Sequence, residues 1–214
     1  MVENVLIVGL CGRSGSGKGY VCDLFSRYGI PSVDTDAVYR DIVDCGYPED
    51  NSCLFELREE FGDAIIRGGG GLDRRKLADI VFCDHNEDSL KRLNEITHKY
   101  ILEKTLDLVR EFGHLGYRCV IIDAPVLFES GFDRICDRTI CVTAPLDVAV
   151  LRICNRDGIT PEKAKSRLAG QMSESRIRAI CDMEIYNDGV SDVEEQIVNI
   201  IEYFGLVGGL HEKQ

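Results

Sequence analysis

The chain has 214 residues, of which 44% are hydrophobic and 29% are charged, and its formal net charge is −12 at pH 7. These values are typical of a globular protein with one full core and a smaller appended domain, and they exclude a disordered tail. The acidic balance argues against nucleic acid or an anionic membrane as a partner, because both bind broad basic surfaces.

The amino-terminal segment and the cysteines predict a cytoplasmic protein. Residues 1–10 lack the basic start and cleavage site of a secretory signal, and no stretch approaches 18 uncharged apolar residues. The ten cysteines contain no CxxC pair and no Cys/His spacing of a zinc site. We therefore expect free thiols that pack as small hydrophobes.

The first predicted strand leads into a glycine-rich loop. Residues 4–10 (NVLIVGL) form a nearly continuous apolar run, which is typical of a strand buried on both faces of a parallel sheet. After the loop, apolar residues recur at helical spacing until Gly29 marks the end of a helix. The sequence GRSGSGK at 12–18 therefore lies between a strand and a helix.

Further strands and helices alternate along the chain. Residues 30–34, 117–123 and 138–143 are short apolar runs typical of strands, and helical patterns follow from Asp36 to about residue 44 and from near Pro145. This alternation predicts an α/β fold of the phosphate-loop type, with a three-layer parallel sheet and crossover helices.

About seventy residues between the second and third strands have a helical texture. NSCLFELREEFG, LDRRKLADIVF and residues 87–112 carry apolar residues three or four apart, so we interpret them as a helical insertion, with a turn at GGGG (68–71). Later, Thr160 and Pro161 suit the N-cap and first turn of the helix PEKAKSRLAGQ. The thin apolar stripe of that basic helix makes it a candidate lid.

The loop has the glycines and the lysine of a phosphate-binding loop. The pattern GxxxxGK is complete from Gly12 to Lys18, in the strand-to-helix context that the motif requires. Glycines let backbone N–H groups turn toward the anion, and lysine reaches the outer phosphates. The next position, where a Ser or Thr hydroxyl normally binds Mg²⁺, is Gly19. Either the site has decayed and uses no metal, or a water replaces the hydroxyl, since Mg²⁺ commonly keeps several waters.

Three aspartates at strand ends are candidates for metal binding or catalysis. Asp123 ends the hydrophobic run VIID, the usual form of the second metal-binding motif in phosphate-loop proteins. Asp34 and Asp36 end the second strand in VDTDAV, and the ends of parallel strands crowd together beside such a loop. For Asp36, which precedes a predicted helix, helix capping is an equally good interpretation.

Taken in order, these motifs resemble those of the dephospho-CoA kinases, which phosphorylate the ribose 3'-hydroxyl of dephospho-CoA with ATP. The resemblance runs from VGLCGRSGSGKG through GIPSVDTDAVYR, FGDAII, LDRRKLADIVF, His98 and DAPVLFESG to RICNRDGITPEKAKSRLAGQ and YNDG. It implies ATP and dephospho-CoA as substrates, Mg²⁺ as cofactor, no nucleic-acid or membrane partner, and a monomer or weak homo-oligomer. It also implies a nucleotide-binding core at residues 1–40, 114–150 and 181–214, a helical CoA-substrate domain at 41–113 and a lid at 151–180.

Position by position, the resemblance implies roles for particular residues. Lys18 would hold the ATP phosphates, and Asp36, the second aspartate of a DxD pattern, would accept the proton from the ribose hydroxyl and stand at the metal with Asp123. Arg152 would neutralise charge on the transferring phosphate. The other ATP-binding positions implied are Arg13, Ser14, Gly15, Ser16, Gly17, Gly19, Tyr20, Arg156 and Asn187.

On the substrate side, the resemblance implies roles for Arg74 and His98, for which a surface charge and a helix-packing histidine are the alternatives. Arg167 also matches the basic lid, although arginines on a solvated helix are usually just solvated. The family pattern TGGIGSGKST differs here because Arg13 adds a cation and the two hydroxyl residues after the lysine are absent. These departures concern the metal geometry and the rate rather than the fold.

Three functions remain open at this point. The leading hypothesis is an active, Mg²⁺-dependent dephospho-CoA kinase. The second is a nucleotide-binding regulatory protein without turnover, which Gly19 and Tyr20 motivate. The third is a kinase of the same architecture for another nucleoside or nucleotide acceptor. The helical insertion favours the first over the third, because an acceptor as long as the pantetheine arm needs that surface.

Overall fold

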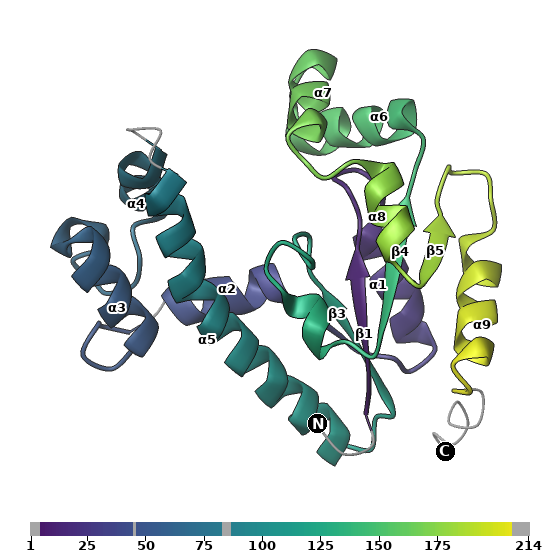
Figure 1. Cartoon of the computed structure of the whole chain (residues 1–214), viewed down its shortest axis with the longest axis horizontal. Helices are drawn as coiled ribbons and strands as arrows, with labels where there is room; N and C mark the ends of the chain where they lie inside the picture. The colour runs from purple at the N-terminus through teal and green to yellow at the C-terminus, as the bar shows by residue number, and fades with distance from the viewer. Residues whose placement is uncertain (1–4, 45, 83–86, 207–214) are drawn as a thin grey trace. The chain divides into compact units, whose positions relative to one another are not determined.

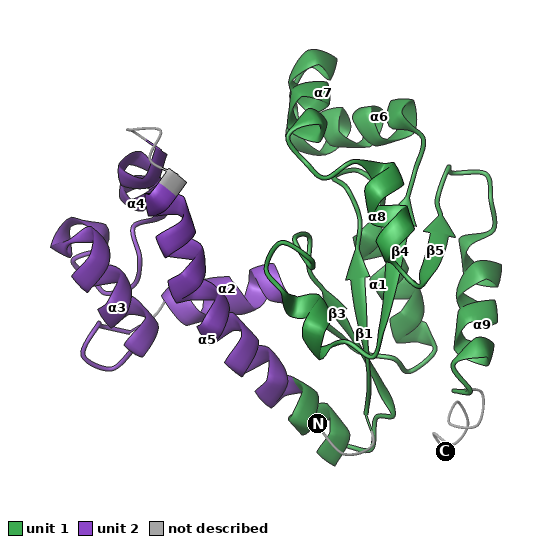
Figure 2. Ribbon diagram, in the orientation of Figure 1, with its two compact units in different colours: residues 1–33, 109–214 green, residues 34–108 purple. Residues whose placement is uncertain are grey.

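The structure, a computed structural model, describes residues 5–44, 46–82 and 87–206 (Figure 1). The chain divides into two compact units, residues 1–33 with 109–214, and residues 34–108 (Figure 2). The assignment of one unit to nucleotide binding and of the other to the acceptor stays a prediction. Within the described ranges, every helix is too short or too polar to cross a bilayer.

The first unit is built on a five-stranded sheet with strand order β2-β3-β1-β4-β5. β1 pairs in parallel with β3 and with β4, and β4 pairs in parallel with β5, so the predicted α/β fold is confirmed. The central position of β1 in the sheet explains its apolar run. Both faces of a central strand are covered, so its side chains are shielded from water. The strands are β1 (Leu6–Cys11), β2 (Ser32–Asp34), β3 (Cys119–Asp123), β4 (Arg138–Thr143) and β5 (Met183–Tyr186).

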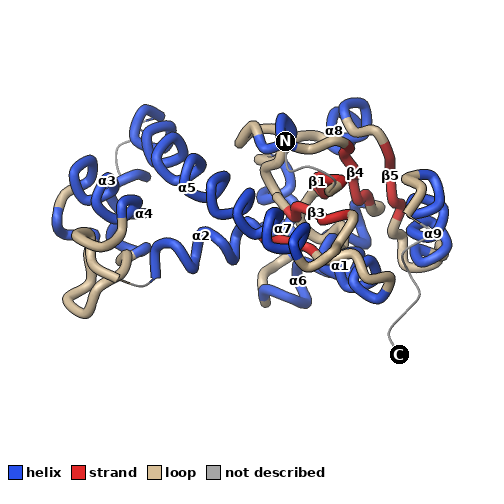
Figure 3. The backbone as a smooth tube through the Cα atoms, turned by 90° about the horizontal axis from the view of Figure 1, so that it is seen from below, coloured by secondary structure: helices blue, strands red, loops and turns tan. Residues whose placement is uncertain are grey.

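Helices cover both faces of this sheet. Figures 1 and 3 show the sheet between α8 on one face and α1 on the other, and α1 contacts α9 at the β5 edge. Fully buried Leu10, Leu24 and Ile140 join β1, α1 and β4 in one core. The helices of this unit are α1 (Lys18–Arg27), α6 (Leu146–Asp157), α7 (Pro161–Ala169), α8 (Glu174–Ile180), α9 (Val193–Tyr203) and the end of α5 (Glu87–His114).

The second unit is helical, as the sequence predicts. It contains α2 (Thr35–Asp44), α3 (Ser52–Phe61), α4 (Arg74–Phe82) and most of α5. Its own core includes Leu54, Leu57 and Leu77. The predicted turn at the four glycines is confirmed by Gly71, which has φ 75° and approaches so closely that an added Cβ would lie 2.4 Å from the Asp44 carbonyl oxygen.

Side-chain caps fix where the helices begin. Thr160 accepts a hydrogen bond from the Lys163 N–H, and Pro161 follows it, so the predicted start of α7 is confirmed. α2, in contrast, begins at Thr35, and Asp34 Oδ1 accepts from the N–H groups of Asp36 (2.8 Å) and Ala37 (3.2 Å). The capping interpretation of Asp36 is therefore wrong, because Asp34 already performs that task and Asp36 lies inside the first turn.

Candidate functional site

The glycine-rich segment 12–18, hereafter the phosphate loop, connects the end of β1 to the first residue of α1. Gly15 and Gly17 have φ of 79° and 95°, in the left-handed region that L side chains rarely adopt. An added Cβ on Gly15 would lie 2.4 Å from the Ala149 carbonyl oxygen, and one on Gly17 would lie 2.2 Å from Asn187 Nδ2. Both glycines are therefore required by conformation and by space.

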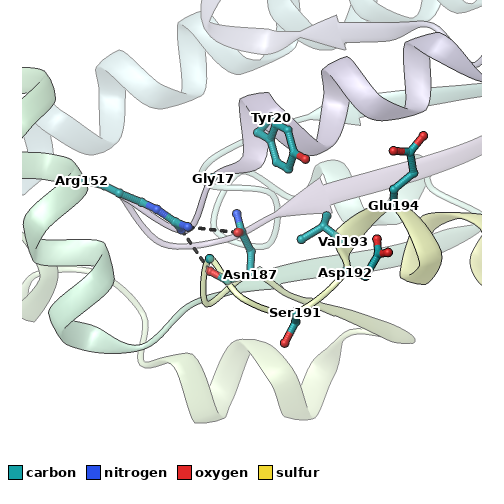
Figure 4. Close-up of a pocket in the computed structure, with 9 residues that line it drawn as sticks. Gly17, Tyr20, Arg152, Asn187, Ser191, Asp192, Val193 and Glu194 are labelled. Atoms are coloured by element: carbon teal, nitrogen blue, oxygen red, sulfur yellow. Dashed lines mark hydrogen bonds between the residues drawn. The ribbon is translucent and has the colours of Figure 1, made fainter.

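Arg152 and Asn187 hold the phosphate loop by its carbonyl groups (Figure 4). Arg152 Nη1 donates to the carbonyl oxygens of Gly15 and Ser16, both at 3.2 Å, and Arg152 Nη2 donates to Asn187 Oδ1 at 3.0 Å. Asn187 Nδ2, which is buried, donates to the same Ser16 carbonyl at 2.9 Å. Because these carbonyls are bonded on one side, N–H groups of the loop other than those of Ser14 and Ser16, which have partners in the protein, are left for an anion on the other side.

This network gives Arg152 a structural task that the sequence analysis does not contain. Its guanidinium group donates to the phosphate loop and to Asn187, whose backbone carbonyl accepts a further bond at 3.1 Å. The role of Arg152 in neutralising the transferring phosphate stays a prediction. Asn187, which the resemblance implies as an ATP-binding residue, follows β5 and reaches the loop through its side chain.

The first half of the phosphate loop contacts the predicted lid. Arg13 Nη2 donates to the Leu168 carbonyl oxygen in α7, and the Ser14 N–H donates to Gln171 Oε1 at 3.0 Å. Gln171 is missing from the sequence-based candidates, although it closes the motif PEKAKSRLAGQ. Its contact with the loop joins residues far apart in the chain, and spacing alone does not reveal it.

Lys18 and Asp123 form an ion pair at the carboxyl ends of β1 and β3. Lys18 Nζ lies 3.5 Å from Asp123 Oδ1, and the side chains are 15% and 18% exposed. The strand register pairs Asp123 with Leu10, so the parallel ladder itself brings this carboxylate to the loop. The nearby thiol of Cys22 stays protonated, because burial and then the charge of Asp123 raise its pKa to about 12.

Two arginines of the predicted lid share one carboxylate. Arg156 donates to both oxygens of Asp157, at 2.7 and 3.0 Å, and Arg167 Nη1 donates to Asp157 Oδ2. Hydrogen bonds from Arg156 and then Arg167 lower the pKa of Asp157 to about 2. Asp157 is therefore ionised at neutral pH, and it holds both guanidinium groups at the junction of α6 and α7.

The predicted acceptor-side residues lie in the second unit. Arg74 Nη2 lies 2.9 Å from Asp44 Oδ2, and the guanidinium stands over the Tyr39 ring at 5.8 Å from its centroid. His98 lies in α5 and is partly buried, which lowers the pKa of its imidazole. Asp36 occupies the first turn of α2. The structure gives each of these residues a defined local setting, and their roles toward an acceptor stay predictions.

The pKa of His98 predicts a loss of stability at acidic pH. Because the folded state lowers this pKa below its ordinary value of 6.5, the unfolded state binds more protons once the pH falls below that value. We expect the free energy of unfolding to fall more between pH 7.5 and 5.5 in the natural protein than in His98→Gln, measured by urea denaturation. Equal losses in the two proteins would show that His98 titrates alike in both states.

Comparisons with known proteins point to one family. A family model described as dephospho-CoA kinase matches residues 6–192. A curated dephospho-CoA kinase from Bacillus licheniformis is 31% identical over 198 residues, which are 92% of this chain and 96% of that relative. A solved structure of a Thermus thermophilus protein has a TM-score of 0.77 at 29% identity and covers 94% of this chain and 98% of its own. The dephospho-CoA kinase from Campylobacter jejuni shares the fold, with a TM-score of 0.59 at 21% identity, covering 95% and 98%.

Proposed function

The chain belongs to the dephospho-CoA kinase family, and we propose that it transfers the γ-phosphate of ATP to the ribose 3'-hydroxyl of dephospho-CoA, giving CoA and ADP. The observation that carries this proposal is the phosphate loop with Lys18 and Asp123 paired at the carboxyl ends of adjacent parallel strands. That edge is where phosphorylated ligands bind in open α/β sheets. The family relation supplies the acceptor, which the loop alone does not specify.

The transfer requires alignment and charge neutralisation more than covalent chemistry. The ribose 3'-oxygen attacks the γ-phosphorus, its proton passes to a carboxylate oxygen of Asp36, and the bond from phosphorus to the bridging oxygen of ADP breaks. Lys18 and the loop N–H groups would hold the phosphates through this change. Arg156 and Arg167 share the single carboxylate of Asp157, so this cluster would supply a net positive charge at the predicted lid.

The residues beside the loop fit a bound Mg²⁺ ion, which the family relation implies. Mg²⁺ is bound by one or two carboxylates together with substrate phosphates and several waters. Asp123 supplies such a carboxylate at the loop. The Ser16 hydroxyl, buried in the loop, has no hydrogen-bond partner in the described part of the chain, as expected of a group that awaits a ligand. When bound, the ion would neutralise charge on the phosphate oxygens.

Incubation of the pure protein with ATP, Mg²⁺ and dephospho-CoA tests the proposed activity. We expect CoA and ADP in equal amounts, resolved by chromatography and mass spectrometry. Binding of ATP with no product, under conditions in which an authentic dephospho-CoA kinase works, would favour the regulatory protein. Faster phosphorylation of a nucleoside or nucleotide in an acceptor panel would favour a different kinase.

Gly19 gives a prediction about the metal. Beyond the neighbouring helix backbone, an added Cβ at this position has no atom within 4 Å, so a small side chain has open space there. If water stands in for the usual hydroxyl, Gly19→Ser should lower the Mg²⁺ concentration needed for half-maximal rate. The matched control is Gly19→Ala, which should stabilise the helix by about 1 kcal/mol without changing the Mg²⁺ dependence. An unchanged Mg²⁺ dependence in Gly19→Ser would mean that other groups already complete the metal shell.

A further inference from the structure

A pocket of about 540 Å³ lies beside the phosphate loop, entirely within the first unit (Figure 4). This volume is typical of a site for a small molecule. In Figure 4 the ring of Tyr20, from α1, lies on one side, Arg152 reaches Asn187 on another, and Asp192 and Glu194 lie at the far side from Arg152. The lining residues are Gly17, Tyr20, Arg152, Asn187, Gly189, Ser191, Asp192, Val193 and Glu194.

Charge orients a nucleoside triphosphate across this pocket. Gly17 and the first turn of α1 form the end at which backbone N–H groups attract phosphate. Asp192 and Glu194 form the opposite end, where their carboxylates repel phosphate and accept hydrogen bonds only. The uncharged nucleoside therefore belongs in the space between the loop and these carboxylates.

Several polar groups of the pocket wall already have partners within the protein. Arg152 and Asn187 direct their side-chain hydrogen bonds to each other and to loop carbonyls. Asp192 Oδ1 caps α9 by accepting from the Glu195 N–H, and Glu194 Oε1 accepts from the Tyr28 hydroxyl. Arg152 and Asn187 therefore have few donors left for a base, whereas the two carboxylates can still accept, and contact between the base and an uncovered face of the wall becomes a main source of recognition.

Tyr20 supplies the aromatic face. It is the third residue of α1, lines the pocket and is 50% exposed, so a large part of its ring has no protein cover. Stacking of a nucleobase on an aromatic side chain is worth enough to change affinity about tenfold, and a purine offers more stacking area than a pyrimidine. We propose that Tyr20 is a specificity-determining residue of this chain, which holds the nucleobase by stacking and favours purine over pyrimidine nucleotides.

This inference rests on the proposed function only in requiring that the pocket binds a nucleotide. Its test therefore measures nucleotide binding in the absence of dephospho-CoA. The dissociation constants of ADP and CDP are measured by calorimetry with the natural protein, Tyr20→Phe and Tyr20→Leu. We expect Tyr20→Phe to stay within about twofold for both ligands, because the ring remains. Tyr20→Leu should weaken ADP about tenfold and CDP distinctly less. The control is Tyr203→Leu, an exposed tyrosine of α9 outside the pocket lining, which should change neither constant.

The outcomes separate this proposal from the proposed function. Equal weakening of ADP and CDP in Tyr20→Leu, or no weakening, overturns the role of Tyr20 even if the protein makes CoA. Selective weakening of ADP supports the role even if no CoA forms. Thermal unfolding of each variant identifies a change that merely disturbs α1, since such a change lowers the melting temperature of the free protein and weakens both ligands alike.

Discussion

Lys18→Ala is expected to lower kcat for CoA formation by about 10²–10³-fold, the usual effect of removing one preorganised group that stabilises charge in a transition state. The ammonium group lies at the start of α1, next to the loop N–H groups, and its partner Asp123 fixes its position. Initial rates at saturating ATP and dephospho-CoA measure the change. Because the two side chains are only 15% and 18% exposed, the variant takes an ion-pair partner from a largely buried carboxylate, so we also expect a lower melting temperature, and kcat is measured well below it.

Two further variants define what the lysine contributes. Lys18→Arg keeps the charge but replaces a compact ammonium group with a larger planar one, so we expect it to recover only part of the lost rate. Lys91→Ala removes an exposed lysine of α5, paired with Glu95 at 4.0 Å, and should leave kcat unchanged. If Lys18→Ala had the same kcat as the unsubstituted protein, the phosphate loop would not be used for phosphoryl transfer.

Local patterns predict the elements that local forces form. The apolar run of β1, the glycines and the helical spacing of α1 follow one another directly in the sequence. Each of these signals is local, so the strand, the loop and the helix can be predicted from the sequence. β5 is missing from the predicted strands, because Met183–Tyr186 is too short for a period to be recognised and includes the polar Glu184. It forms because β4 offers it an edge to pair with.

The sequence predicts which residues belong to the site better than it predicts their contacts. Gly17, Lys18 and Asp123 are found from motifs, because each motif consists of the residue types that its chemistry requires. The bonds of Arg152 to the loop and of Ser14 to Gln171 depend on the packing of α6 and α7, which no spacing encodes. The start of α2 shows a different limit: Asp34 and Asp36 both satisfy the capping rule, and only the backbone decides that Asp34 is the cap.

Because Asp34, and not Asp36, caps α2, the variant Asp36→Asn tests catalysis rather than folding. The cap of α2 remains with Asp34, and asparagine has nearly the same shape as aspartate, so the helix should keep its boundaries. Loss of a negative charge in the first turn should cost about 0.3–1 kcal/mol of stability. If Asp36 accepts the ribose proton, kcat should fall by about 10²–10⁴-fold, because an amide accepts no proton at neutral pH.

Asp79→Asn is the matched control, since Asp79 is an exposed carboxylate on α4 in the same unit. It should keep the natural kcat, so that a fall in Asp36→Asn cannot come from the change of net charge. The KM for dephospho-CoA separates two roles of Asp36. A fall in kcat with an unchanged KM indicates action on the transferring proton, whereas a higher KM with a natural kcat would reduce Asp36 to an acceptor-binding group. An unchanged kcat and KM would require another base, or attack by a hydroxyl that loses its proton only after the phosphorus has accepted its oxygen.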